Sequence, residues 1–246
     1  MAEKKGLPLL PWGDTPKSSL FLIALPDRVA ASSSLSFLDG VGQEGTIVYL
    51  SGWPLLLGSP PPLPDLLLFA PKAIAKRVSE GDYSAAVGVH ANRSGNAEDT
   101  IPLLSSLLGS TRNIQATATE ELVADLFSEQ SVLCGWAPEL ALRAYKTLVD
   151  CGIPKELAWE ECVGEVAALF DVLATQGPEA FSRMISDAAL IGGTRVARDF
   201  PETAWDRLVD RILPPIQDLT FPRSLSKGDR DKMRLDALHH WSGRKK

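Results

Sequence analysis

Two pairs of carboxylates carry most of the chemistry that this sequence suggests. Asp125 and Glu129 lie in TEELVADLFSEQSVLCG, and Glu161 and Glu165 lie in ELAWEECVGEVAALF. Both stretches have the apolar spacing of helices, so each pair is expected to project from one helical face, about one turn apart. Like charges at this spacing destabilise a helix by roughly 0.2–0.5 kcal/mol unless a cation or hydrogen bonds neutralise them. On spacing alone the alternative is a solvated face with surface salt bridges, but two such pairs meeting in space would form a cage for hard divalent cations.

The bulk composition narrows the class of protein. The chain has 246 residues, enough for one large domain or two small ones, and its net charge of −6 argues against nucleic acid as the main partner. Its three cysteines show no CxxC or CxxH spacing, which predicts reduced thiols. No apolar run reaches the ~18 residues of a membrane span, and MAEKKGLPLLPWGD lacks the apolar core of a signal peptide. We expect a cytoplasmic protein with no membrane partner.

The pattern of apolar residues changes near residue 115. Before it, short apolar runs bounded by turn formers predict strands of a largely parallel sheet, at 19–25, 45–52, 65–71 and 83–91. After it, apolar spacings of three and four predict helices over 118–133, 138–150, 155–176, 178–188, 201–213 and 230–241. Proline precedes several of these helices, and Pro214-Pro215 is expected to stop one of them. The sequence therefore predicts an α/β domain over 1–115 and an all-α domain over 116–246.

Three segments of the helical part suggest a family. The runs DLFSEQSVLCG (125–135), ELAWEECVGEV (156–166) and MIS (184–186), with LPDRVA (25–30), APK (70–72) and VHANRSGNAEDT (89–100) before them, resemble the ketol-acid reductoisomerases. These enzymes join an N-terminal Rossmann domain to an all-helical, knotted domain. Two magnesium ions drive an alkyl shift in a 2-hydroxy-2-acyl acid, and NADPH reduces the product. The resemblance implies a truncated Rossmann-like parallel sheet followed by the knotted helical domain.

The resemblance also assigns metal ligands. Asp125 and Glu129 match the first metal-binding pair of the family, and Asp125 is the position expected to bridge two ions. Glu161 and Glu165 match the second pair, which in the short form of the family reaches the site from the partner subunit. The resemblance thus implies two Mg²⁺ or Mn²⁺ ions and a homodimer.

The resemblance implies substrate contacts as well. Ser186 matches a serine that contacts the substrate carboxylate, and Lys72 matches a lysine beside the substrate and metals. Lys72 and Glu165 are the candidate proton carriers. From the residues alone, Ser186 could equally begin a helix, and Lys72 could cap the edge of the sheet.

The sequence departs from the family at the dinucleotide site. The only GxGxxG pattern, GVGQEG at 40–45, lies before a predicted strand rather than between a strand and a helix, so no glycine-rich dinucleotide turn is predicted, and the first half of the Rossmann unit has no counterpart in the matched segments. Ser51-Gly52 stands where the family has a histidine before a glycine, and Ala73-Ile74-Ala75 replaces a glycine-rich turn. These changes make NADPH doubtful as a cofactor.

Three functions follow, and the first is the one we favour. It is a magnesium-dependent isomerase or lyase that performs isomerisation or enolisation on a small 2-keto or 2-hydroxy acid without NADPH. The second is a non-catalytic dimeric paralogue acting as a scaffold or regulator. The third is a genuine NADPH-dependent reductoisomerase with an altered cofactor site.

Overall fold

The computed structural model describes residues 18–73, 78, 81, 83–225 and 230–242 of the chain. The leader before residue 18, and with it the expectation about a signal peptide, lies outside this part, as do Ile74 and Ala75. The chain divides into two compact units, residues 1–125 and 126–246. Among the described residues, no helix combines the length and the apolar character needed to cross a membrane.

The first unit is built on a five-stranded sheet in the order β1-β2-β3-β4-β5. Neighbouring strands are parallel except β3 and β4, which are antiparallel. The largely parallel sheet and its first four strands were predicted and are confirmed, whereas β5 was not predicted. The strands are β1 (Leu20–Ile23), β2 (Thr46–Tyr49), β3 (Asp65–Pro71), β4 (Tyr83–Ala91) and β5 (Ser110–Gln115).

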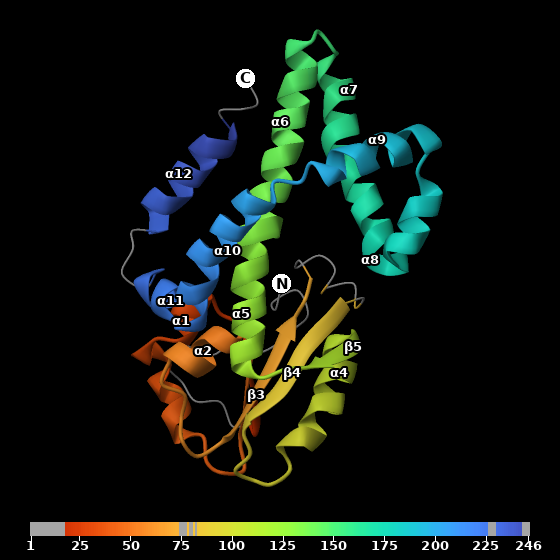
Figure 1. Cartoon of the computed structure of the whole chain (residues 1–246). Helices are drawn as coiled ribbons and strands as arrows, with labels where there is room; N and C mark the ends of the chain where they lie inside the picture. Colours follow the sequence, from red (N-terminus) through yellow and green to blue (C-terminus); the bar gives the residue numbers. More distant parts are fainter. Residues whose placement is uncertain (1–17, 74–77, 79–80, 82, 226–229, 243–246) are drawn as a thin grey trace. The chain divides into compact units, whose positions relative to one another are not determined.

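Apolar residues cover both faces of this sheet, as expected for strands that read as continuous apolar runs. Successive side chains of a strand point to opposite faces, so Leu66 and Leu68 join one core and Leu67 and Phe69 join the other. The first face is covered by α1 (Asp27–Ala30), η2 (Ser33–Gly40) and α2 (Gly52–Leu57). The second is covered by η3 (Ala97–Asp99) and α4 (Thr100–Leu108), so the unit has three layers (Figure 1).

The second part of the chain is helical, as predicted. Helix α5 (Ala118–Ser128) runs across the boundary between the units. Two of the segments that follow, η4 and η5, are π-helical, with wider turns than an α-helix. The elements after α5 are η4 (Glu129–Trp136), α6 (Ala137–Asp150), α7 (Lys155–Trp159), η5 (Glu160–Gly164), α8 (Glu165–Met184), α9 (Asp187–Arg198), α10 (Glu202–Gln217), α11 (Thr220–Leu225) and α12 (Arg230–Ser242).

Several helix boundaries differ from the prediction. The break expected between 176 and 178 is confirmed, because Gly177 adopts a positive φ of 82° inside α8. The helix predicted over 178–188 ends at Met184, and Ser186 begins the unpredicted helix α9 as its N-cap. The expectation that Pro214-Pro215 stops α10 was wrong, since the helix continues to Gln217. The Pro214 carbonyl still accepts a hydrogen bond from the Asp218 amide, because proline lacks only the donor.

Candidate functional site

Polar residues follow the carboxyl ends of three adjacent parallel strands. Asp27 comes after β1, Ser51 and Gly52 come after β2, and Lys72 comes directly after β3. Because β1, β2 and β3 are parallel, their carboxyl ends lie at one edge of the sheet. This edge is where ligands bind in open α/β sheets. The same edge is therefore the place to look for a site in the first unit.

Lys72 forms the centre of the site. Its ammonium Nζ donates to Glu121 Oε1 at 2.5 Å and to Asp125 Oδ1 at 3.0 Å, both on α5. The Glu121 side chain is 2% exposed, whereas those of Lys72 and Asp125 are 31% and 40% exposed. One carboxylate is thus buried behind the lysine, and the other is open to solvent. A ligand could reach Lys72 and Asp125 without displacing Glu121.

The backbone at Gly52 holds the buried carboxylate from the other side. The Gly52 amide donates to Glu121 Oε2 at 2.7 Å. A Cβ at position 52 would collide with the backbone carbonyl oxygen of Ala118, so only glycine permits the α2 N-terminus to pack this closely against α5. Both carboxylate oxygens of Glu121 therefore have a donor. This arrangement fixes the first turns of α5 at the edge of the sheet.

Burial and the nearby groups of opposite charge shift the pKa values of these side chains in opposite directions. Burial raises the pKa of Glu121, against the lowering effects of Lys72 and of the Gly52 amide. Burial also raises the pKa of Asp27, with Asp125 adding to the rise, although a hydrogen bond from Ser51 opposes it. For Lys72, burial lowers the pKa, but the hydrogen bond and charge of Glu121, with those of Asp125, outweigh burial and raise it. The site thus holds a persistent cation beside carboxyls that bind protons more tightly than usual.

The structure brings two of the predicted site residues together, Lys72 and Asp125. Glu129 is the first residue of η4, Glu161 lies within η5, and Glu165 is the first residue of α8. Both predicted metal pairs therefore lie at boundaries between α- and π-helix, which are frequent at functional sites.

The assignment of these acids to one metal cage stays a prediction. Within the part of the chain that the structure describes, no three His, Cys, Asp or Glu side chains gather into a group that could hold a metal ion. The remaining predicted residue, Ser186, caps α9 by accepting a hydrogen bond from the Ala189 amide at 3.2 Å. Its predicted contact with a substrate carboxylate also stays a prediction.

The residues around the first pair have the chemistry that a hard cation and an oxygen-rich ligand require. Carboxylate oxygens are the ligands that Mg²⁺ prefers, and Asp125 and Glu129 would supply them. The amide nitrogen of Gln130, next to Glu129, is buried without a hydrogen-bond partner among the described residues. A buried donor of this kind is costly unless it is satisfied, so it suits an incoming carboxylate or hydroxyl oxygen. The two carboxylates are thus of the type that would hold such a cation, and the Gln130 amide is of the type that would bind an oxygen of the ligand.

Sequence reasoning missed Glu121 and Asp27. Glu121 lies four residues before Asp125, as Asp125 lies four before Glu129, so three acids are spaced at helical turns. That regularity could have singled out Glu121, but it is equally typical of a solvated helix face. Asp27 begins the helix that follows the first strand, in the segment LPD, a position that points to the site edge once the sheet is known to be parallel there.

Comparison with known families identifies the helical part. Residues 119–243, just over half of the chain, match the sequence profile of the ketol-acid reductoisomerase C-terminal domain. This places the helical part in the class of helical domains that complete a Rossmann-type enzyme. The chain belongs to the ketol-acid reductoisomerase family.

Solved structures extend the likeness over the first unit. The fold matches an NADH-preferring ketol-acid reductoisomerase from an uncultured archean, with a TM-score of 0.82 and 25% identity, over 99% of this chain and 76% of that one. It also resembles a semialdehyde dehydrogenase NAD-binding protein from Cupriavidus necator, solved with calcium and NAD, with a TM-score of 0.64, 14% identity and coverage of 88% and 83%. A pyrroline-5-carboxylate reductase from Coxiella burnetii gives 0.61 at 11% identity, over 92% and 84%. The last two likenesses show the fold alone.

Proposed function

We propose that this chain is a magnesium-dependent enzyme that performs isomerisation or enolisation on a small 2-keto or 2-hydroxy acid. The observation that carries the proposal is the Lys72–Glu121–Asp125 cluster at the carboxyl edge of the sheet. A cation beside one buried and one exposed carboxyl suits a substrate that carries negative charge and exchanges a proton. Family membership supports the same class of chemistry.

The cations would be held by the four predicted acids. Asp125 and Glu129 would bind from one helix, and Glu161 and Glu165 from the other, with two Mg²⁺ or Mn²⁺ ions between them. When bound, such ions polarise carbonyl and hydroxyl oxygens and stabilise an oxyanion. The exposure of the Asp125 side chain, 40%, supports its role, because a ligand needs access to the carboxylate.

The residues of the proposed site would have different roles in the reaction, set by their protonation states. Glu121, buried with both carboxylate oxygens hydrogen-bonded, would keep Lys72 in place and protonated rather than contact the substrate. Lys72 keeps its proton and would stabilise the oxyanion, so we favour it as a fixed charge rather than as a base. Glu165 remains the candidate for moving a proton, and Ser186 for contacting the substrate carboxylate.

Calorimetric titration with Mg²⁺ and Mn²⁺ tests this function. The wild-type chain should bind either ion, and Asp125→Asn should weaken binding at least tenfold because one ligand charge is lost. Asp150→Asn is the matched control, since Asp150 is an exposed helical acid paired only with Lys146 in the described contacts. No binding by the wild type, or equal binding by Asp125→Asn, would favour the non-catalytic scaffold or regulator instead.

A dinucleotide-dependent reductoisomerase is the second candidate function. The archaeal protein with TM-score 0.82 is described as NADH-preferring, and it aligns with nearly the whole chain. The doubt about NADPH, drawn from the lack of a glycine-rich turn between a strand and a helix, therefore finds no support in the comparisons. Fluorescence titration with NADH and NADPH decides: saturable binding with reduction of the isomerised acid would favour this candidate over cofactor-free chemistry.

We also propose that the chain forms a homodimer through its helical unit. Helices α8 and α9 contain no buried residue, although Phe170 is 52% exposed on the first and Ile191 is 55% exposed on the second. Large exposed apolar side chains on two consecutive helices favour an interface with a second copy of the chain. Sedimentation should show a dimer, and Phe170→Glu should shift it toward monomer, whereas Lys146→Glu should not.

The cytoplasm is the proposed location. Cys134, Cys151 and Cys162 are free thiols, and two of them are exposed. Exposed free thiols suit a reducing compartment. Fractionation of cells that express the tagged full chain would test this location.

A further inference from the structure

The helical unit contains a cavity of its own, bounded by the end of η4 and by α10. Its volume of about 560 Å³ falls within the range of small-molecule sites, roughly 300–1,000 Å³. The lining residues are Trp136, Ala204, Arg207, Leu208, Asp210 and Arg211. None of them belongs to the site of the proposed function, so this cavity is still without a role.

Trp136 forms the aromatic part of the lining. Its ring packs against Trp205, with centroids 5.7 Å apart, and against Phe200, with centroids 6.2 Å apart. Trp205 in turn packs against Phe127 at 6.3 Å. These edge contacts fix the Trp136 ring, which together with the buried Leu208 offers a flat apolar surface to an occupant of the cavity.

Arg207 and Arg211 supply positive charge to the same lining. They lie four residues apart on α10, so their side chains leave the helix on one face. Within the part of the chain that the structure describes, neither arginine side chain forms a hydrogen bond or an ion pair. Asp210 is the acidic member of the lining, so two arginines and one aspartate give a net charge of +1. The cavity therefore combines an aromatic surface with guanidinium donors that are free to bind an anion.

We propose that this cavity binds a flat aromatic ring that carries a carboxylate. The ring would pack against Trp136 and Leu208, and the carboxylate would accept hydrogen bonds from Arg207 and Arg211, whose planar guanidinium groups match carboxylate geometry. One negative charge on the ligand balances the net charge of the lining, whereas a second would meet only the repulsion of Asp210. This site goes beyond the proposed function, which concerns a small acid at Lys72.

Calorimetric titration of the full chain with 2-naphthoate tests the proposal. Divalent cations are left out, so that the proposed metal site has no ion to which the carboxylate could bind. The wild type should bind 2-naphthoate saturably. 2-Naphthamide, which has the same shape without the charge, should bind at least about tenfold more weakly, the effect of a hydrogen bond to a charged group. Acetate, which has no ring, should not bind measurably.

A fourth probe tests the kind of anion. 2-Naphthyl phosphate carries the same ring with a second negative charge, and it should bind no more tightly than 2-naphthoate. Tighter binding of the phosphate would overturn the assignment of a carboxylate.

Variants locate the binding. Arg207→Gln and Arg211→Gln should each weaken 2-naphthoate about tenfold or more. Both arginines are exposed and without a partner in the described contacts, so these variants should keep the fold. Trp136→Ala should also weaken binding, but it removes the packing with Phe200 and Trp205, so the arginine variants decide.

Two further variants serve as controls. Arg143→Gln changes a 68% exposed arginine of the same unit that lies outside the cavity, and it should leave 2-naphthoate binding unchanged. Lys72→Gln should also leave it unchanged, because the two sites are separate. If the wild type does not bind 2-naphthoate, or if both arginine variants bind it as the wild type does, the inference is wrong. The proposed function would still stand, since binding of Mg²⁺ is measured separately.

Discussion

The two units of this chain bury their apolar residues to very different extents. Strand β3 of the first unit buries six of its seven residues, and its side chains fill cores on both faces of the sheet. In the second unit, α8 and α9 bury none. The first unit completes its own core and so can hold a lysine between two carboxylates. The second carries the remaining predicted site residues on helices that still expose large apolar side chains.

The largest effect should come from the core of the first unit. Phe69 is fully buried, so Phe69→Ala removes a large apolar side chain and leaves a cavity. We expect a loss of about 3–5 kcal/mol in the free energy of unfolding, measured by urea denaturation. The matched change Phe170→Ala, on α8, should cost less than about 0.5 kcal/mol in dilute protein. Comparable losses of stability at the two positions would contradict the difference in burial between the units.

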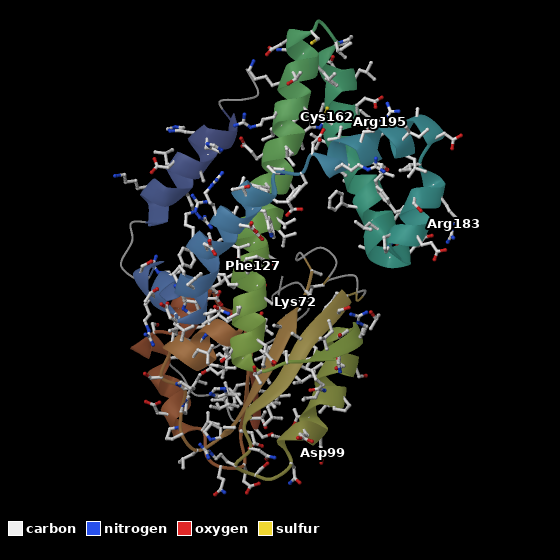
Figure 2. All side chains as sticks on the ribbon, in the orientation of Figure 1. Lys72, Asp99, Phe127, Cys162, Arg183 and Arg195 are labelled. Atoms are coloured by element: carbon white, nitrogen blue, oxygen red, sulfur yellow. The ribbon has the colours of Figure 1, made fainter. Side chains whose placement is uncertain are left out.

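A second effect concerns a buried acid that serves structure alone. Asp65 accepts hydrogen bonds from the amides of Arg93 and Ser94, at 2.5 and 2.9 Å, and from the Ser94 hydroxyl at 2.6 Å. Asp65→Ala leaves these donors unsatisfied and should cost about 2 kcal/mol. The control is Asp99, an exposed acid labelled in Figure 2. Asp99→Ala should leave the free energy of unfolding almost unchanged.

The pH dependence of the Asp65 effect has a defined sign. Burial raises the pKa of Asp65, but the hydrogen bonds from Ser94 and Arg93 outweigh burial and lower it below its ordinary value of 3.8. A carboxyl with a lowered folded-state pKa stabilises above its ordinary value and loses that contribution as pH falls through the folded pKa. The stability difference between wild type and Asp65→Ala should therefore shrink below pH 3.8. A difference that grows in acid would contradict this.

Glu121, the buried acid of the site, should show the opposite sign. Its folded-state pKa is raised, so its contribution is complete below the ordinary value of 4.5 and is lost as pH rises through the folded pKa. Glu121→Gln should therefore gain stability relative to wild type across that window, in thermal melts at a series of pH values. Glu120→Gln is the control, because Glu120 is an exposed capping residue with a lowered pKa and should show no such gain.

The smallest effect is expected for a lysine of the helical unit. Lys146 bonds Asp150 at 2.6 Å, as Lys72 bonds its carboxylates, but both partners are exposed. Lys146→Gln should change the free energy of unfolding by at most about 0.5 kcal/mol and leave Mg²⁺ binding unaltered. Lys72→Gln removes the cation that pairs with the buried Glu121, so it should lower the free energy of unfolding clearly more than Lys146→Gln does. Equal effects would mean that the ion pairs of Lys72 contribute no more to stability than the exposed pair of Lys146.

The elements found from sequence are those whose apolar pattern is strong. Strands β3 and β4 match the predicted 65–71 and 83–91 at every residue, because their apolar runs are bounded by turn formers. Strand β5 escaped notice because STRNIQ has a single apolar residue, and its partner β4 rather than its own composition makes it a strand. The π-helical turns of η4 and η5 also lack a residue pattern that announces them.

The site was predictable only in part for a related physical reason. Lys72 and Asp125 were expected at one site through their matched positions, and they do bond one another. From its local sequence, Glu121 resembles a solvated helical acid. Its burial comes from Gly52 and the sheet edge, which are distant in sequence: the hydrogen bond from the Gly52 amide to Glu121 joins residues 69 positions apart. Chemistry that depends on such tertiary contacts leaves little trace in local spacing.

The π-helical segment η5 also makes the second acid pair sensitive to chain length. Glu161 lies inside this segment and Glu165 begins the α-helix that follows it. A π turn amounts to one residue inserted into an α-helix. Removing a single residue from 160–164 would turn α8 by about 100° relative to α7, since one α-helical residue spans that angle. Such a deletion would keep all four predicted ligands in the sequence and still turn Glu165, with the rest of α8, relative to the residues of α7.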